Sequence, residues 1–243
     1  MSGHSKWATT KHKKAIIDSK RSKVFTKVAK LVTIAARDGK SGDPVMNPSL
    51  RLAIDNAKAV SMPKDNIDRA IKRGLGGLDG GAQLEEIVYE AYAPGGVALL
   101  IECLTDNKNR ALGEIRALLN KAGGSLAATG SVGYLFKKVG QIIVDESTNS
   151  AKGDDLDMII IDSGAEDFSR EEDLVVITCA FTELNHVNAT LKDAGVLVES
   201  SEVVYIPNTF LDVSEDKKIS VENLIEAIDD LDDVNSVYTN ASL

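Results

Sequence analysis

The side chains of this protein that are best suited to chemistry are basic, and they are concentrated at one end of the chain. Residues 1–73 contain 17 Lys and Arg against 6 Asp and Glu, a net charge of +11. Residues 74–243 contain the other 11 bases against 31 acids, a net charge of −20. This asymmetry predicts a polyanion-binding segment joined to acidic domains. Charge runs also occur on helix surfaces that only contact water, and that interpretation stays open.

The first fourteen residues combine bases with an aromatic side chain. Four lysines, His4 and His12 surround Trp7, and the stretch has no helical periodicity. Cations that neutralise phosphate, together with an indole that stacks on an exposed base, are typical of binding to unpaired nucleotides. A tail with incidental lysines is the alternative. Neither histidine has a cysteine or carboxylate at metal-ligand spacing, so no metal site is predicted.

Three helices are predicted to follow, and bases line two of them. From Lys20 to Arg37 apolar residues recur at helical spacing, which indicates one buried stripe with bases on the adjoining face. Asn47-Pro48 predicts the start of a second helix, and Pro63 starts a third that Gly74 stops. The predicted nucleic-acid-binding residues are Lys6, Trp7, Lys11, Lys13, Lys14, Lys20, Arg21, Lys23, Lys27, Lys30, Lys64, Arg69, Lys72 and Arg73.

A glycine-rich stretch, Lys72 to Gln83, is predicted to be a linker. Beyond it, EEIVYEAYA and VALLIECLT have the pattern of two strands joined at Pro94-Gly95-Gly96. A helix from Asn109 to Lys121 and a strand at SVGYLF are expected next. Residues 137–206 have the pattern β-α-β-β-α-β, which is the order of the ferredoxin-like fold.

The chain ends with a predicted helix, Ser220 to Leu231, and a strand, SVYTN, which would complete the unit that begins near residue 80. We therefore expect an α+β protein: an N-terminal helical bundle followed by two α/β (ferredoxin-like) domains, the third inserted in the second. The expected boundaries are 1–78 for the basic bundle, 79–136 plus 207–243 for the second domain, and 137–206 for the insertion.

No catalytic constellation is found. His186 has no serine or cysteine nucleophile near it in the sequence, and the carboxylates of the first hairpin predict at most an acidic patch. Cys103 and Cys179 lie in apolar runs, as expected for buried free thiols in a reducing cytosol. No run approaches the ~18 apolar residues that span a bilayer. We expect a cytoplasmic protein that is not an enzyme and uses no cofactor, metal, membrane or small-molecule substrate.

Several stretches closely resemble the YebC/PmpR family, whose mitochondrial relatives are translational activators. They are GHSKWATTKHKKAIIDSKRSKVFTK, NPSLRLAID, MPKDNIDRAIKRG, YEAYAPGGVALLIECLTDNKNR and LDDVNSVYTN, so the match runs nearly end to end. Ala91 and Ala93 depart from the glycines that many members have. The resemblance implies three domains, no catalytic residues and a cytoplasmic protein usually described as a DNA-binding transcriptional regulator. Some members are instead described as ribosome-associated factors that help translation through proline-rich stalls.

The identity of the nucleic acid stays open between two functions. A DNA-binding regulator is favoured by the resemblance and the basic bundle. A ribosomal RNA binder acting in translation is favoured by Trp7 and by lysines, which suit phosphate better than the bidentate reading of bases. A protein-only scaffold is the third alternative. The expected partner is DNA first, with ribosomal RNA and the ribosome second. The resemblance places binding on the basic residues from Lys6 to Lys27, with those from Lys64 to Arg73 next.

Overall fold

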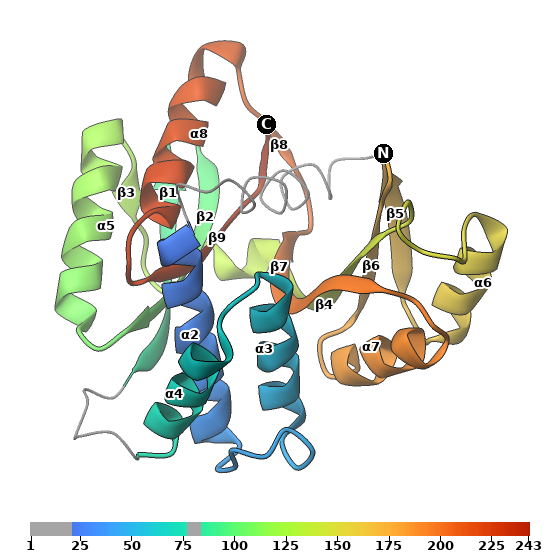
Figure 1. Cartoon of the computed structure of the whole chain (residues 1–243). Helices are drawn as coiled ribbons and strands as arrows, with labels where there is room; N and C mark the ends of the chain where they lie inside the picture. The colour runs from blue at the N-terminus through green and yellow to red at the C-terminus, as the bar shows by residue number, and fades with distance from the viewer. Residues whose placement is uncertain (1–20, 77–83) are drawn as a thin grey trace. The chain divides into compact units, whose positions relative to one another are not determined.

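The computed structural model describes residues 21–76 and 84–243 as a mixed α+β protein, in which helices precede mainly antiparallel sheets (Figure 1). The chain divides into two compact units. One comprises the described residues up to 76 together with Lys138–Val204, and the other comprises residues 84–137 together with Tyr205–Leu243. None of the described helices has the length and apolar character that crossing a membrane requires.

The described part of the first unit begins with three helices, α2 (Arg21–Asp38), α3 (Pro48–Ala59) and α4 (Lys64–Gly74). Phe25 and Val28 of the stripe predicted in α2 pack against a shared apolar core, as expected. The buried members of that core are Val32, Ala36, Leu50, Ala53, Ala57, Met62, Ile67 and Ala70. Isolated helices of this length are marginally stable in water. The three helices therefore depend for their stability on the apolar face that each of them buries in this shared core.

Two boundaries of these helices bear on the sequence predictions. The start of α3 is confirmed: the Asn47 side chain accepts a hydrogen bond from the Leu50 N–H at 3.0 Å, and Pro48 is the first helical residue. The predicted linker begins too early, since α4 continues through Lys72 to Gly74. The carbonyl of Ile71 accepts from the Leu75 N–H at 3.1 Å, which keeps this last turn helical.

The same unit contains a four-stranded sheet with two helices. Its elements are β4 (Phe136–Asp145), α6 (Asp154–Asp162), β5 (Asp167–Glu171), β6 (Leu174–Ala180), α7 (Leu184–Asp193) and β7 (Val198–Pro207), in the predicted order β-α-β-β-α-β. The strand order is β5-β6-β4-β7. Ile142 lies opposite Ile177 on neighbouring strands, and both belong to one buried cluster with Leu156 of α6 and Leu191 of α7. The two helices therefore cover the same face of the sheet.

The second unit is built on the predicted hairpin of β1 (Glu85–Ala93) and β2 (Val97–Thr105), which pair antiparallel from Glu85–Thr105 to Ala93–Val97. The turn between them uses Gly95 and Gly96 at φ values of 87° and 79°, where other residues are strained. The unit also contains α5 (Lys108–Ala122), β3 (Ser125–Leu126), β8 (Leu211–Asp212), α8 (Glu215–Asp229), β9 (Val234–Thr239) and β10 (Ala241–Ser242).

The C-terminal strand β9 pairs with β2, so the sheet order is β3-β1-β2-β9. This is the pairing expected if the end of the chain completes the unit that starts near residue 80. Ala98 and Leu100 of β2 pack on Val132 and Phe136, so alternate residues such as Leu99 face the other side of the sheet. The division into domains at residues 78, 136 and 206 stays a prediction.

Two predictions for this unit are wrong. SVGYLF is not a strand: its centre is a 3₁₀ turn, Gly133–Leu135, and β4 begins only at Phe136. The reason is that the Glu90 carboxylate accepts hydrogen bonds from the N–H groups of Val132 and Gly133, which are then unavailable to a sheet. In addition, α8 begins at Glu215 and not at Ser220. Glu215 and Asp216 complement the helix dipole in its first turn, which the sequence pattern missed because that turn carries no apolar stripe.

Candidate nucleic-acid interface

Three of the predicted binding residues of α2, Lys23, Lys27 and Lys30, lie by helical spacing on the side of the helix away from the residues that pack in its core. Lys23 is exposed, and Lys27 and Lys30 are half-buried. Each of the three takes part in a hydrogen bond or electrostatic interaction within the molecule. Arg21 is the first residue of α2. Lys6, Trp7, Lys11, Lys13, Lys14 and Lys20 lie outside the described residues.

The predicted binding residues of α4 are all at the surface. Lys64, Arg69, Lys72 and Arg73 are exposed, while Ile67 and Ala70 of this helix are buried. Within residues 21–76 and 84–243, none of these four bases forms an ion pair. Two bases in the last turn also complement the helix dipole. That structural role accounts for part of the pattern but does not require four exposed cations on eleven residues.

Helices α2 and α4 are brought side by side by one polar contact and one close approach. The Thr33 hydroxyl bonds to the carbonyls of Ala29 at 2.9 Å and of Ala70 at 3.2 Å, which links the two helices inside the core. At Gly74 the helices come so close that a Cβ would lie 2.2 Å from the Thr33 carbonyl oxygen. Glycine is therefore required where α4 ends, and the bases of Lys72 and Arg73 lie at the end of the bundle where α2 also ends.

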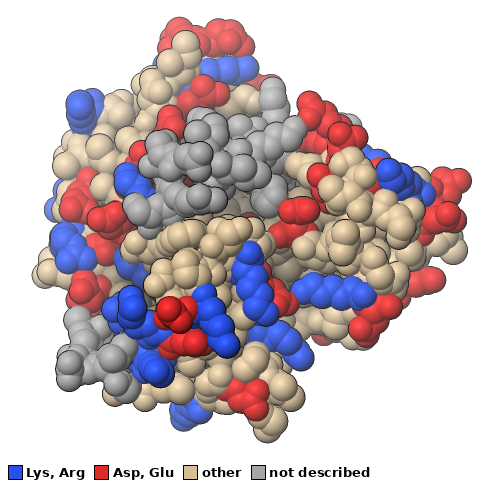
Figure 2. Space-filling model, viewed as in Figure 1, with Lys and Arg blue, Asp and Glu red and all other residues tan. Residues whose placement is uncertain are grey.

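The charges of this region differ in sign from those of the rest of the chain. Residues 21–76 carry 12 bases and 5 acids, a net charge of +7, whereas residues 84–243 carry 11 bases and 30 acids, a net charge of −19. Figure 2 shows Lys and Arg gathered over the N-terminal helices and Asp and Glu gathered around α6. A surface of this kind attracts polyanions and repels other acidic molecules.

The acidic groups around α6 are held by an arginine. Arg170 pairs with Asp157 and, at 3.3 Å, with Glu146. The Gly153 N–H donates to Glu146 at 2.5 Å, and this bond, against a smaller opposing effect of burial, lowers the pKa of that carboxyl below its ordinary value. Among the described residues, no cluster of three or more histidine, cysteine or acidic side chains could hold a metal ion.

The groups considered for catalysis are not brought together in the described structure. His186 is exposed on α7, and the thiols of Cys103 and Cys179 are buried and free, as predicted. Burial raises the pKa of Cys179 to about 11, so this thiol is protonated at neutral pH. Of the hairpin carboxylates, Glu90 is turned inward onto backbone N–H groups and does not contribute to a surface patch.

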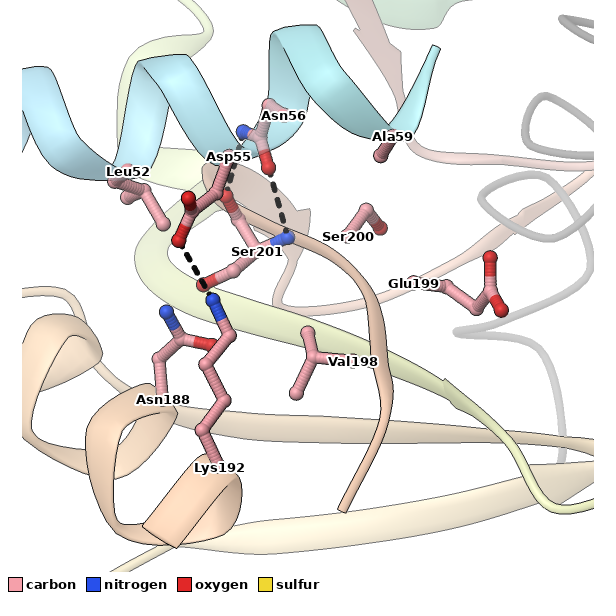
Figure 3. Close-up of a pocket in the computed structure, with 10 residues that line it drawn as sticks. All are labelled: Leu52, Asp55, Asn56, Ala59, Asn188, Lys192, Val198, Glu199, Ser200 and Ser201. Atoms are coloured by element: carbon pink, nitrogen blue, oxygen red, sulfur yellow. Dashed lines mark hydrogen bonds and ion pairs between the residues drawn. The ribbon is translucent and has the colours of Figure 1, made fainter. Parts of the chain in front are cut away.

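One small cavity lies between α3, α7 and β7 (Figure 3). An ion pair, Lys192 Nζ to Asp55 Oδ2 at 2.7 Å, and a hydrogen bond from the Asn56 amide to the Ser201 carbonyl at 2.8 Å line it. Its volume is about 30 Å³. That is room for one or two water molecules, whereas ligand pockets usually enclose about 300 Å³ or more. Among the described residues, Oδ1 of Asn188 and the Ser201 hydroxyl find no hydrogen-bond partner, so both suit such waters.

Two family models together cover nearly the whole chain. The model described as the TACO1/YebC protein N-terminal domain matches residues 5–77. The model described as the TACO1/YebC second and third domain matches residues 84–241. The break between them falls at the segment that separates the basic helices from the first sheet.

Curated relatives match over the full length. A protein of Thermobifida fusca named "Probable transcriptional regulatory protein" is 48% identical over 243 residues, which are 100% of this chain and 96% of the relative. A protein of the same name from Bifidobacterium animalis subsp. lactis is 49% identical over 240 residues, 99% of this chain and 94% of the relative. The crystal structure of a conserved hypothetical protein from Aquifex aeolicus has a TM-score of 0.86 and 38% identity, and covers 93% of this chain and 92% of that one.

Proposed function

Because this chain belongs to the TACO1/YebC family, whose curated relatives are named probable transcriptional regulators, we propose that it is a regulatory protein that acts by binding nucleic acid through its basic N-terminal region. The observation that carries the proposal is the charge asymmetry, with a net +7 on residues 21–76 and a net −19 on residues 84–243. A polyanion would be drawn to one part of the chain only.

The contact surface that we propose combines the exposed bases of α4 with the lysines of α2 and the basic residues that precede them. Lys64, Arg69, Lys72 and Arg73 have no ion-pair partner in the described part of the chain, so binding phosphate would break no internal pair. DNA is the proposed target, in line with the relatives' names. Ribosomal RNA is the competing target that the experiments below discriminate.

The test measures affinity as a function of salt. If about six phosphates are neutralised, the logarithm of the association constant for a DNA duplex should fall with the logarithm of salt concentration with a slope near −5. The variant Lys64→Glu/Arg69→Glu/Lys72→Glu/Arg73→Glu should bind at least tenfold more weakly and show a slope smaller in magnitude by roughly 3–4. Fluorescence anisotropy of a labelled 20-bp duplex in 50–200 mM salt gives both quantities.

A matched control reverses the same amount of charge on other parts of the chain. Arg116, Lys121, Lys152 and Lys217 are also exposed, and changing all four to Glu alters the net charge equally. If the interface is basic and local, this control should lower affinity far less than the α4 variant does. Equal losses in the two variants would show that only net charge matters, and the proposed surface would then be wrong.

A further inference from the structure

The loop between α2 and α3 is tightly built, although it has no regular secondary structure. The Asp43 carboxylate accepts from the Val45 N–H at 2.9 Å, and the Asp43 carbonyl accepts from the N–H groups of Met46 and Asn47, both at 3.1 Å. The Asn47 amide in turn donates to the carbonyl of Ala35 at 2.8 Å. These bonds fix the backbone that carries Val45 and Met46, which we call the tip.

The side chains of the tip point away from this framework. Val45 and Met46 are each 75% exposed, although both are large and apolar. Single exposed apolar residues are ordinary on protein surfaces. Val45 and Met46 are adjacent, and hydrogen bonds fix their backbone, so together they form a preorganised apolar projection. Binding a partner would therefore cost little further loss of backbone entropy.

The loop that carries the tip contacts the basic end of α4 through Gly42. Gly42 packs on Leu75, because a Cβ at Gly42 would lie 2.9 Å from the Leu75 Cδ1 atom. Leu75 is itself 48% exposed and directly follows the last turn of α4, which carries Lys72 and Arg73. The same end of the bundle therefore presents an apolar projection and two cations that have no ion-pair partner among the described residues.

We propose that the tip is an apolar wedge that contacts nucleobases which are out of the helical stack, while Lys72 and Arg73 hold the adjacent phosphates. The proposal rests on the proposed function and specifies how the same surface would choose its target. Val45 and Met46 offer no hydrogen-bond groups to base edges, so they can gain energy only from base faces that are already exposed or easily unstacked. The neighbouring positive charges favour a polyanion over an apolar pocket in another protein.

The experiment compares the full-length parent with the variant Val45→Ser/Met46→Ser on two probes. One probe is a perfect 20-bp duplex, and the other is the same duplex with a three-nucleotide bulge that contains 2-aminopurine. We expect the variant to bind the bulged probe about tenfold more weakly, because two apolar side chains no longer bury surface against the bases, and the duplex within about twofold of the parent. The 2-aminopurine fluorescence change that accompanies binding of the parent should be lost. The salt slope should stay the same, because no charge is removed.

The matched control is Met158→Ser/Ile161→Ser on α6, which removes a similar pair of apolar side chains, each 59% exposed. This control should bind both probes as the parent does. Because the tip is exposed, both double variants should unfold at nearly the parent temperature. A tip variant with full affinity for the bulged probe, or with equal losses on both probes, overturns the wedge.

Failure of the wedge is distinguishable from failure of the proposed function. If the α4 charge-reversal variant loses affinity while the tip variant binds both probes normally, the basic surface stands and the wedge is wrong. If the α4 variant binds normally and the tip variant loses only the bulged probe, the wedge stands and the phosphate contacts are elsewhere. A parent chain that binds neither probe overturns both proposals.

Discussion

The side-chain amide of Asn47 donates a hydrogen bond to the main-chain oxygen of Ala35 at 2.8 Å, which ties the start of α3 to the end of α2. The same amide donates to the Ser41 carbonyl at 3.2 Å, and its oxygen caps α3 by accepting from Leu50. Asn47 is only 3% exposed, and a Cβ at Gly39 would lie 2.0 Å from its amide nitrogen. Asn47 therefore acts as both a helix cap and a cross-link of the loop that presents the tip.

We expect Asn47→Ala to lower the free energy of unfolding by about 2–4 kcal/mol, because it removes a helix cap and the two hydrogen bonds that the amide donates to the carbonyls of Ala35 and Ser41. Asn47→Asp keeps the capping oxygen but sets a carboxylate against those carbonyls, so it should be no more stable than the alanine variant. The control is Asn107→Asp, since Asn107 caps α5 through Arg110 alone and is exposed. Urea titration should show a change under about 0.5 kcal/mol for this control. An Asn47→Asp variant with the same free energy of unfolding as the parent would contradict the cross-linking role of Asn47.

The capping half of this role was predictable from the sequence, and the cross-linking half was not. Asn47-Pro48 is a local signal for a helix start, and the apolar stripe of α2 and the hairpin turn at Gly95-Gly96 are equally local. The bond to Ala35 depends on how two helices pack, which no short pattern records. The exposure of Val45 and Met46 also depends on tertiary packing, because the sequence of an apolar pair in a loop does not show whether the pair faces the core or the solvent.

The wrong strand at SVGYLF has a long-range cause as well. Its backbone is held by Glu90, which lies about 40 residues earlier, on the hairpin. The local pattern of apolar residues favours a strand, but a buried carboxylate must be satisfied by donors, and the turn supplies three of them. For the binding residues, the sequence identifies the basic side chains but not their exposure, and the structure adds that the four on α4 are exposed.

Glu90 should contribute to stability in a pH-dependent way. Glu90 is 8% exposed, and this burial raises its pKa. Hydrogen bonds from the N–H groups of Gly130, Val132 and Gly133 together lower the pKa by more than burial raises it, so the pKa lies below its ordinary value of 4.5. A carboxyl whose pKa is lowered by folding stabilises the protein above about pH 4.5, and this contribution is lost as the pH falls through the folded-state pKa. The proton is therefore bound more readily by the unfolded chain.

We expect Glu90→Gln to cost about 1–3 kcal/mol at pH 7, because the amide replaces one acceptor by a donor that faces N–H groups. The difference from the parent should stay constant down to about pH 5 and shrink below it. Glu86→Gln on the same strand is the control, since Glu86 is exposed, and it should cost under about 0.5 kcal/mol. Urea denaturation between pH 3 and 8 measures both. A stability difference between Glu90→Gln and the parent that grows as the pH falls below 5 would contradict a lowered pKa of Glu90.

The two thiols should be unreactive until the protein unfolds. Cys179 is fully buried with a pKa of about 11, and Cys103 is buried within β2. Because the thiolate is the reactive species, little of it is present at pH 8 and little reagent can reach it. We expect Ellman's reagent to titrate neither thiol in the native chain and both in 6 M guanidinium. Rapid reaction of one thiol in the native protein would show that one of the two sheets opens readily.

Trp7 offers the sharpest test of DNA against RNA. Trp7→Ala removes no charge, so affinity for a perfect DNA duplex should change by less than about twofold. On a ribosomal RNA loop with unpaired bases, loss of one stacking platform should cost about 1–3 kcal/mol, and Trp7→Phe should restore most of it. Both affinities can be measured by fluorescence anisotropy. If Trp7 and the tip contact different bases, the costs of Trp7→Ala and Val45→Ser/Met46→Ser should add to within about 0.5 kcal/mol. A Trp7→Ala defect confined to the RNA loop would favour the translational function. If Trp7→Ala binds the duplex and the RNA loop as tightly as the parent does, Trp7 is not part of the binding surface.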